Sequence, residues 1–470
     1  MNILTAAEEN GKTLAALLGI DEGEATELLN LTVLISADTD DSAALFMAQR
    51  LVEILSRTVS CVTPTLQGCP KPSVEVVIGT RARSSSAAKI WVSISDSRIL
   101  ISDTILDGKK PSSVHKSFLI LGACYTSAYV MKVAVGGLQL GHRGSIIIDE
   151  HELLGDDRFT LNNAVDIENT YLAGGGAIGN AFLYALRFFN VSGRLNIVDP
   201  KKVRDGNLNR CMFFNKADIG FQKAERLVQA AQPFFEKLEL VGHNTVLNEV
   251  PERSHGSWLK RLIVAVDSRR ARRTLQNEHP GEVFDASTTD YREVVFHHHR
   301  QPAVGACLSC IYHEEPLEHA HEKHVADVLG VSVSDVQSGF ITDITAELIC
   351  AKYPQLTPRE LAGKAYDTLF KQLCGEGQLK TSEDLQVLAP FSFVSVLAGT
   401  YQAIELVRRI QKNVQGHEFN YWRLSPWASP QVRLRSMRPR LSGCEFCGDE
   451  VQKKVTELLW GGKSRHPTHR

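Results

Sequence analysis

The sequence has little of what marks several broad classes of protein. Its 52 basic and 54 acidic residues leave a formal charge of -2, which gives no field that would favour nucleic acid or an anionic membrane. The N-terminus lacks a cationic start followed by an apolar core, so we expect a cytoplasmic rather than a secreted protein. Ten cysteines in 470 residues are too few for a disulfide scaffold. Repeats and low-complexity tracts are also absent.

Long apolar runs are missing too. The most apolar stretch, 117–141, carries Lys132 and several hydroxyl groups, so it predicts a packed helix plus a strand rather than a membrane span. What is present is the composition of a soluble globular protein, 43% hydrophobic and 23% charged, in a chain long enough for two or three domains.

Residues 1–150 predict an α/β module. An apolar strand runs into an amphipathic helix over 31–58, two further strands are predicted within 74–95, and the stretch 117–135 fits a buried helix. This module has no glycine-rich phosphate loop, because Gly79 stands alone after its strand. We therefore expect it to support catalysis elsewhere in the chain rather than to perform it.

A second α/β module is predicted over 151–310. Its first part belongs to a polar linker or approach helix over 149–169, and a βαβ unit follows. Gly174, Gly176 and Gly179 form a G-x-G-x-x-G pattern between the first strand and the helix. The first two glycines let the backbone turn tightly and approach a phosphate, and the third lets the helix pack close to the sheet. The pattern predicts a nucleotide site.

Four polar residues after the glycine turn indicate which chemistry the phosphates would serve. Asp199 ends the next strand and can accept from ribose hydroxyls, which with the glycines alone would favour a nicotinamide or flavin enzyme. Asn207, Arg210 and Lys223 follow. Nucleotidyl transfer needs such converging cations, because charge builds on the α-phosphate and on the leaving pyrophosphate, whereas a dehydrogenase does not. The competing interpretation is a solvated turn with surface cations.

Asp267 ends a further apolar strand, 261–267. A carboxylate there should face the crevice where open α/β sheets bind ligands. Because magnesium needs only one or two carboxylates plus phosphates, Asp267 is a candidate Mg²⁺ ligand. The alternative is that it only caps the helix that follows.

Two CxxC pairs frame the last part of the chain, and their spacing suits tetrahedral zinc. The pairs are far apart in sequence, so a shared zinc would be structural and would tie the C-terminal tail to the core. Between them, 311–390 predicts a polar helical insertion, and 391–470 predicts an amphipathic helix and strands that close the second module. The four cysteines are Cys307, Cys310, Cys444 and Cys447.

The ordered set of motifs resembles the ThiF/MoeB/ubiquitin-activating family over roughly 165–310 and 391–447. The set comprises G-x-G-x-x-G, Asp199, Asn207-Leu-Asn-Arg210, Lys223, Asp267-x-x-x-x-Arg272 and the two CxxC pairs. The resemblance implies a Rossmann-like domain that uses ATP to adenylate the C-terminal glycine of a ubiquitin-fold protein. By that resemblance Asp199 would hold the ribose, Asn207, Arg210 and Lys223 the phosphates, Asp267 the Mg²⁺, and the four cysteines a structural zinc.

Two departures from the family pattern matter. The arginine-rich helix that often precedes the glycine strand, and acts on the partner subunit's ATP, has no recognisable counterpart here, since only Arg143 and Arg158 lie nearby. The module over 1–150 resembles the inactive adenylation half of ubiquitin-activating enzymes. Such a half would replace or supplement the second protomer of a homodimer.

Cys374 is the candidate acyl acceptor. It lies in the segment QLCGEGQLKTSED, which predicts a glycine-bearing loop, and it resembles the thioester cysteine of the family. The alternative is that Cys374 is a bystander. We expect Cys61, Cys69, Cys124, Cys211 and Cys350 to be packed or incidental, and the histidines at 297–299 and 313–324 to lie on the surface rather than to bind a metal.

The sequence as a whole predicts an enzyme that adenylates a ubiquitin-like protein, passes it to Cys374 and then to a carrier of the ubiquitin-conjugating kind. The short tail after Cys447 leaves no room for a large carrier-docking domain, which by resemblance favours a bacterial conjugation system, hypothetically an antiviral one. One alternative is activation of a sulfur carrier for thiamine or molybdopterin synthesis, or of a peptide or tRNA. Another is a non-catalytic scaffold.

Overall fold

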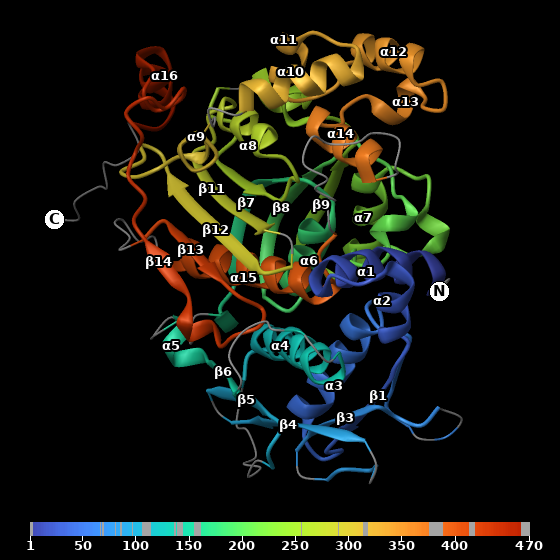
Figure 1. The fold of residues 1–470 in the computed structure, drawn as a ribbon. Helices are drawn as coiled ribbons and strands as arrows, with labels where there is room; N and C mark the ends of the chain where they lie inside the picture. Colours follow the sequence, from blue (N-terminus) through green and yellow to red (C-terminus); the bar gives the residue numbers. More distant parts are fainter. Residues whose placement is uncertain are drawn as a thin grey trace, which may run out of the picture.

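A computed structural model describes most of the chain. Figure 1 shows one sheet at the bottom of the view, a larger sheet in the middle, and a group of helices above the larger sheet. The described residues are 3–65, 67, 70–79, 81–84, 87–95, 97–105, 114–135, 138, 144–154, 161–254, 256–289, 291–313, 318–375, 389–412 and 419–461.

The N-terminal module is a six-stranded sheet in the order β2-β1-β3-β4-β5-β6, parallel from β2 to β4 and antiparallel at β5 and β6. The strands and helices predicted in the first 135 residues are confirmed as β1, β3, β4, α3 and α4. The strands are β1 (Thr32–Ala37), β2 (Cys61–Thr63), β3 (Val74–Ile78), β4 (Ala88–Ile94), β5 (Arg98–Ser102) and β6 (Ile146–Asp149). The helices are α1 (Ile3–Leu18), α2 (Glu22–Leu28), α3 (Ser42–Leu55), α4 (Lys116–Ala134) and α5 (Glu150–Leu154).

Helix α4 lies between the two sheets, where it packs against α3 and against a long helix of the second module (Figure 1). Among the described residues it is the one helix long and apolar enough to cross a membrane by length and composition. Its most apolar stretch is 83% buried inside the protein, as in the core helix of a globular domain.

The second module is built on an eight-stranded sheet in the order β14-β13-β12-β11-β10-β7-β8-β9. Strands β9, β8, β7, β10 and β11 are parallel, and β12 to β14 extend the sheet as antiparallel strands. The chain runs outwards from β7 to β9 and then returns to β10 on the other side of β7, so the strand order reverses between β7 and β10. Ligands of open α/β sheets bind at such a reversal, beyond the carboxyl ends of the strands.

The strands of the second module are β7 (Val165–Ala173), β8 (Val191–Val198), β9 (Leu238–His243), β10 (Arg261–Val264), β11 (Glu282–Thr289), β12 (Glu293–Arg300), β13 (Tyr421–Leu424) and β14 (Leu434–Ser436). Its α-helices are α6 (Ala177–Leu186), α7 (Lys223–Ala231), α8 (Arg269–Gln276), α9 (Leu308–Ile311), α15 (Ser392–Lys412) and α16 (Glu450–Trp460). Short 3₁₀ turns are η2 (Asp205–Asn207), η3 (Lys216–Asp218), η4 (Gln232–Phe234), η5 (Leu247–Glu249), η6 (Pro251–Ser254) and η7 (Pro430–Val432). Strand β7 begins inside the segment predicted as a linker, and α16 was not predicted.

One hydrophobic core joins the two modules. Leu51 on α3, Phe182 on α6 and Leu397 on α15 are fully buried members of the same cluster. Helix α15 crosses α6 closely, since a Cβ added at Gly399 would stand 2.3 Å from the backbone nitrogen of Phe182. The predicted amphipathic helix over 392–410 is therefore confirmed as the element on which both modules pack.

The predicted helical insertion forms a cap with its own core, which includes Leu329, Ile349 and Phe370. Figure 1 shows these helices above the carboxyl ends of the parallel strands. They are α10 (Glu318–Leu329), α11 (Val333–Gln337), α12 (Asp343–Lys352), α13 (Pro358–Leu361) and α14 (Tyr366–Gly375).

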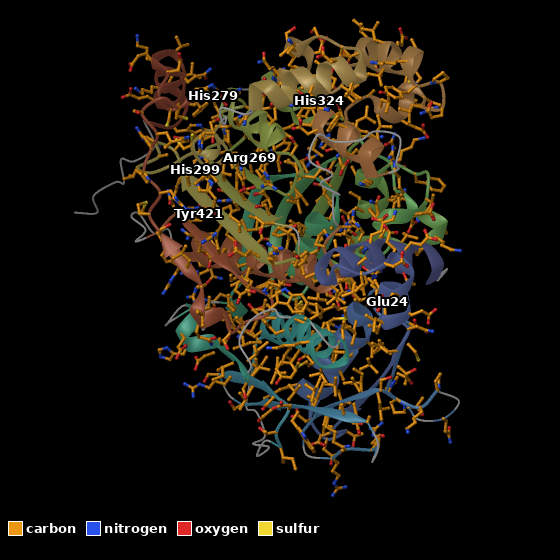
Figure 2. All side chains as sticks on the ribbon, in the orientation of Figure 1. Glu24, Arg269, His279, His299, His324 and Tyr421 are labelled. Carbon is orange, nitrogen blue, oxygen red and sulfur yellow. The ribbon has the colours of Figure 1, made fainter. Side chains whose placement is uncertain are left out.

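The surface position predicted for the histidines 297–299 is wrong. All three lie on β12, the strand between β11 and β13, and are at most 5% exposed; His299 is labelled in Figure 2. His297 Nε2 lies 2.9 Å from the carbonyl oxygen of Ala306, and His298 Nε2 lies 3.1 Å from Glu282. Burial lowers the pKa of His297 to about 4, so its imidazole is neutral at pH 7 and suits an interior position.

Candidate active site

The glycine turn has the geometry that its sequence predicts. Gly174 has a φ of +103°, which favours glycine, and a Cβ there would stand 2.6 Å from the carbonyl oxygen of Ala265. At Gly179 an added Cβ would meet the Gly174 oxygen at 2.0 Å, so this glycine lets α6 approach the turn. A Cβ at Gly176, the N-cap of α6, would meet nothing within 4 Å. That position is open for a ligand at the helix N-terminus.

Asp199 fixes the turn to the next strand. Its Oδ2 accepts from the backbone N–H of Gly175 at 2.8 Å, and its Oδ1 accepts from the N–H of Lys201 at 2.8 Å. The side chain is 5% exposed. Each carboxylate oxygen retains a second lone pair, so Asp199 can still accept from a ribose hydroxyl.

Asn180 connects the glycine turn with the loop that carries Asn207 and Arg210, a role that the sequence analysis missed. Its amide nitrogen donates to the carbonyl oxygens of Gly175 and Gly176 at 2.8 and 3.1 Å. Its amide oxygen accepts from the N–H of Phe213 at 3.1 Å. The signal was present, because Asn180 is a fully buried polar residue within the apolar sequence of α6.

The loop that begins at η2, which Asn180 bonds to the glycine turn, carries the predicted phosphate residues Asn207 and Arg210. Asn207 accepts with Oδ1 from the N–H of Arg204 at 3.0 Å. Arg210 donates from Nη1 to the carbonyl of Gly206 and to Oδ1 of Asn209, each at 2.8 Å. These bonds hold both side chains in place. The competing interpretation, a solvated turn with surface cations, would not need them.

Lys223 begins α7 and is 8% exposed. Burial lowers the pKa of its ammonium, and the nearby carboxylates of Asp199 and Asp267 oppose that shift. A cation held in a poorly solvated position exerts a stronger field on a phosphate than a surface lysine does. Asp199 after β8, Asp267 after β10 and Lys223 at the start of α7 thus lie near one another.

Asp267 lies three residues beyond the end of β10, with its side chain 56% exposed. It is not the cap of α8, because Ser268 occupies that position and accepts from the N–H of Ala271 at 3.3 Å. Its carboxylate pairs with Lys201 Nζ at 3.1 Å. Crowding by neighbouring atoms raises the pKa of Asp267, but Lys201, Lys223 and a hydrogen bond from Thr368 lower it more. Asp267 is therefore ionised, as a Mg²⁺ ligand must be, and a metal would compete with Lys201 for it.

The helical cap packs directly on α8 and on the residue that follows Asp199. Arg270 on α8 bonds to Asp367 on α14 at 3.0 Å and to Glu322 on α10 at 2.9 Å, with both partners largely buried. At the turn before α14, a Cβ added at Gly363 would stand 2.5 Å from Cβ of Pro200, the residue after Asp199. The cap is thus held beside Asp199 and Asp267 by ion pairs and by close packing.

Cys374 lies in the last turn of α14, so the loop predicted at this position is wrong up to Gly375. Its side chain and the residues 376–388 lie outside the described residues, as does Cys69. Of the other cysteines, Cys124 and Cys211 are buried, and burial raises the pKa of both thiols. Cys61 and Cys350 are half-buried.

The two CxxC pairs converge although 133 residues separate Cys310 from Cys444. All four sulfurs lie within 4.8 Å of one another. The Cys307 sulfur is 3.7 Å from those of Cys310 and Cys444. Four sulfurs about 2.3 Å from a tetrahedral zinc would be roughly 3.8 Å apart. The backbone N–H of Leu441 points at the Cys310 sulfur from 3.4 Å, as it would at a metal-bound thiolate. The cluster fits zinc.

Arg272, the last residue of the family motif around Asp267, faces the sheet. Its guanidinium pairs with the buried Asp285 of β11 and donates to the carbonyl of Ala286 at 3.2 Å. Asp285 also accepts from the hydroxyl of Tyr312 at 2.6 Å. Arg272 therefore anchors α8 to the sheet.

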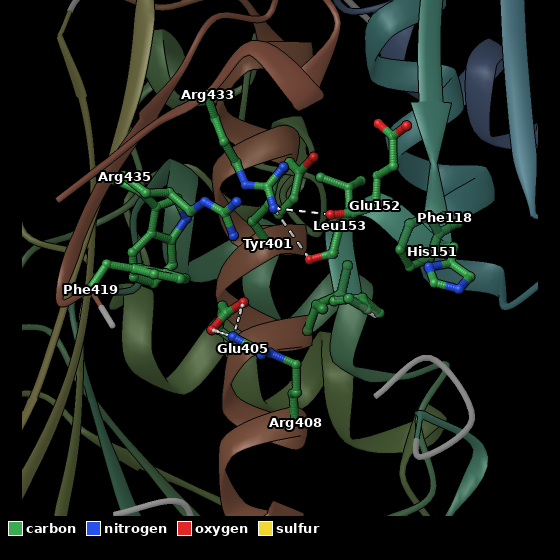
Figure 3. Close-up of a pocket in the computed structure, with 13 residues that line it drawn as sticks. Phe118, His151, Glu152, Leu153, Tyr401, Glu405, Arg408, Phe419, Arg433 and Arg435 are labelled. Carbon is green, nitrogen blue, oxygen red and sulfur yellow. Dashed lines mark hydrogen bonds and ion pairs between the residues drawn. The ribbon is translucent and has the colours of Figure 1, made fainter. Parts of the chain in front are cut away.

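A separate cavity of about 280 Å³ lies between the N-terminal module and α15 (Figure 3). Phe118, Tyr401, Glu405, Arg408 and Arg433 are among its lining residues. Glu405 accepts from Arg408 at 2.7 Å, and Arg433 donates to two carbonyl oxygens of α5 at 3.4 Å. Its lining shares no residue with the glycine turn, so it is not the nucleotide cleft.

Known proteins share both parts of this architecture. The model of the E1 N-terminal domain matches residues 3–155, and the model of the ThiF family matches residues 163–446. An uncharacterized protein of Sinorhizobium fredii (strain NBRC 101917 / NGR234), y4jF, is 28% identical over 290 residues, which cover 58% of this chain and 53% of that protein. The chain thus spans about half the length of this relative. The crystal structure of selenomethionine PaaA matches 58% of this chain and 65% of that chain at 12% identity, with a TM-score of 0.35, which is too low to indicate a shared fold.

Proposed function

Because the chain belongs to the ThiF family, we propose that it adenylates the C-terminal carboxylate of a ubiquitin-like protein with ATP. The observation that carries the proposal is the position of Lys223 and Asp267 near Asp199, which bonds to an open glycine turn, together with the bond by which Asn180 joins that turn to the loop of Arg210. The match of residues 3–155 to the E1 N-terminal domain favours a ubiquitin-like partner over a sulfur carrier, although the same cleft would serve either. The ordered polar residues in the cleft favour an enzyme over a scaffold.

In the proposed reaction, a carboxylate oxygen of the partner attacks the α-phosphorus of ATP. The bond from that phosphorus to the bridging oxygen breaks, and pyrophosphate leaves with the electron pair. The attacking group is already an anion, so the protein need not supply a base. Arg210 and Lys223 stabilise the charge that accumulates on the phosphates, while Asp199 orients the ribose. Bound at Asp267, Mg²⁺ would neutralise phosphate charge.

We further propose that the acyl group passes to Cys374. The thiol loses its proton to solvent, the sulfur attacks the acyl carbon, and AMP leaves with the electron pair. The helix that carries Cys374 supports this step, because Thr368 on α14 bonds to Asp267 and Cys374 follows about 9 Å further along the helix axis. Transfer to a carrier of the ubiquitin-conjugating kind would follow. The zinc is structural, and association of two chains remains a prediction.

The test is ATP–pyrophosphate exchange with the ubiquitin-like protein encoded nearest to this gene. We expect Asp267→Asn to reduce exchange by about 100-fold or more, because phosphate charge would lack its metal anchor. Cys374→Ala should retain exchange and lose a reducible adduct with the partner. Cys350→Ala, a cysteine of the same cap, is the matched control and should retain both. Absence of exchange with every ubiquitin-like or sulfur-carrier candidate would refute the proposal, and an adduct that survives Cys374→Ala would refute the thioester assignment alone.

A further inference from the structure

The N-terminal module reaches the loop that carries Arg210. Arg57 follows α3, and its guanidinium donates to the carbonyl oxygens of Leu208 and, at 3.1 Å, of Met212. These two residues stand on either side of Arg210 in the sequence. One side chain of the first module therefore holds both flanks of the segment that presents the candidate transition-state arginine.

A second contact runs from the same module to the Arg210 side chain itself. Asn10 on α1 donates from its amide nitrogen to the carbonyl of Arg57 at 2.7 Å, and its amide oxygen accepts from Asn209 at 3.1 Å. The amide oxygen of Asn209 in turn accepts from Arg210 Nη1 at 2.8 Å. Asn10 and Asn209 are at most 1% exposed. Because buried amides keep their partners, this relay gives the guanidinium of Arg210 one orientation.

We propose that Arg57 and Asn10 are positioning residues for the adenylation step, an inference that rests on the proposed function. Neither meets the substrate, since the guanidinium of Arg57 ends on two carbonyl oxygens and the amide of Asn10 on Asn209. They act by holding Arg210 where charge develops on the α-phosphate. The N-terminal module would thus contribute to the active site by fixing the conformation of residues 207–212.

The expected kinetic effect follows from that arrangement. Misplacement of a catalytic group by about 1 Å costs up to roughly 100-fold in rate. We expect Asn10→Ala and Arg57→Lys to lower kcat of exchange by about 10- to 100-fold and to leave KM for ATP within about twofold, because the glycine turn, Asp199 and Lys223 remain in place. Arg57→Lys keeps the charge and loses the two-pronged contact, so it tests geometry rather than charge.

A control for lost interface stability is available across the same two modules. The Thr58 hydroxyl bonds to Ser392 of α15 at 3.1 Å rather than to the loop, so Thr58→Ala weakens the interface and leaves the Arg57 and Asn10 side chains in place. We expect Thr58→Ala to retain kcat while its Tm falls as much as that of Asn10→Ala. The positioning role would be overturned if Thr58→Ala and Asn10→Ala lost kcat equally. It would also be overturned if both Asn10→Ala and Arg57→Lys kept a normal kcat.

Hydrogen exchange separates this inference from the proposed function. The backbone N–H groups of Arg210 and Cys211 bond to the carbonyl of Asn207. In Asn10→Ala the hydrogen exchange of these two N–H groups should be at least 10-fold faster than in the wild type, and in Thr58→Ala it should be unchanged. This hydrogen-exchange measurement tests the positioning role even if the wild-type protein shows no ATP–pyrophosphate exchange with any partner. Unchanged protection in Asn10→Ala and Arg57→Lys would refute it whatever the enzyme's reaction proves to be.

Discussion

The two modules each contain a parallel strand that runs into a helix, but they treat the helix N-terminus in opposite ways. At the end of β1, Asp41 caps α3, and its carboxylate accepts from the N–H groups of Ala43 and Ala44 at 2.9 and 3.1 Å. At the end of β7, Gly176 is the N-cap of α6 and has no side chain to offer. One helix N-terminus is filled by the protein's own anion, and the other is left open.

This difference explains why two similar folds would have different tasks. Free N–H groups and the helix dipole at an N-terminus attract an anion. In the N-terminal module Asp41 satisfies them, so a phosphate has no place there. At Gly176 no side chain caps the helix, so the N–H groups of its first turn can bind a phosphate. In our proposal, the first module contributes through the contacts of Asn10 and Arg57, and the second binds the nucleotide.

The largest predicted effect concerns the zinc cluster, which among the described residues belongs to the second module alone. We expect the purified protein to contain about one zinc per chain and Cys444→Ser to lose it, with a loss of unfolding free energy on the order of 5 kcal/mol, because metal binding and folding are coupled. Metal analysis and urea denaturation measure this. Cys61→Ser, in strand β2 of the first module, is the control and should retain zinc. A zinc-free wild-type protein of full stability would contradict the assignment.

The second prediction concerns a substitution that gives the N-terminus of α6 a carboxylate cap like the one that Asp41 gives α3. Gly176→Asp would place a carboxylate where the phosphate is proposed to bind, and the backbone tolerates it, since φ is -79°. We expect exchange to fall about 100-fold or more, equivalent to roughly 2.7 kcal/mol, while thermal stability stays equal or rises slightly through the new cap.

Gly176→Ala is the matched control for this change, because an added Cβ meets nothing within 4 Å in the protein. It should bind ATP more tightly than Gly176→Asp and have similar stability. If Gly176→Asp exchanges at the wild-type rate, the phosphates lie elsewhere and the comparison between the two helix ends fails.

Much of the fold and cleft could be predicted because the signals are local. Apolar strands, the glycine spacing and the polar residues after each strand sit at fixed positions along the chain, so the nearness of Asp199 to the glycine turn and to Lys223 could be predicted from the sequence, while their roles stay a prediction. Asn180 could have been found by the same argument, as a polar residue inside an apolar helix.

The remaining features depend on contacts between distant residues. The pairing of Lys201 with Asp267, and that of Asn10 with Asn209, join segments far apart in sequence. The histidine run of β12 was misjudged because a polar sequence typical of a surface is buried here between β11 and β13, where the neutral imidazole of His297 bonds to the Ala306 carbonyl. No local pattern carries that information.

The third prediction concerns how the stability of the protein depends on pH through His115, the N-cap of α4. His115 caps α4, and its Nδ1 accepts from the N–H of Ser117 at 3.2 Å. Burial, with a smaller contribution from Lys116, lowers the pKa of His115 from 6.5 to about 4. As the pH falls below 6.5, His115 binds a proton in the unfolded chain but stays neutral in the folded chain. The free energy of unfolding therefore decreases until about pH 4. Between pH 7 and pH 5 this residue should cost about 2 kcal/mol of unfolding free energy.

His115→Asn isolates that effect, since asparagine keeps a cap acceptor and does not titrate. Urea denaturation at pH 7, 6 and 5 should show a shallower decline for the variant than for the wild type. Parallel declines would mean that the pKa of His115 is the same in the folded and the unfolded chain, which would contradict a pKa lowered by burial.

The smallest predicted effect is at the filled helix N-terminus. Asp41→Ala removes the cap of α3 and should cost about 1 kcal/mol of stability, whereas Asp41→Asn should keep most of it. Exchange should stay within about twofold of wild type in both variants, because the first module is proposed to act through Asn10 and Arg57 and not through a ligand at this helix. A loss of exchange beyond 10-fold in Asp41→Ala at preserved stability would show that the β1–α3 turn takes part in catalysis, and the two modules would then differ less than their helix N-termini indicate.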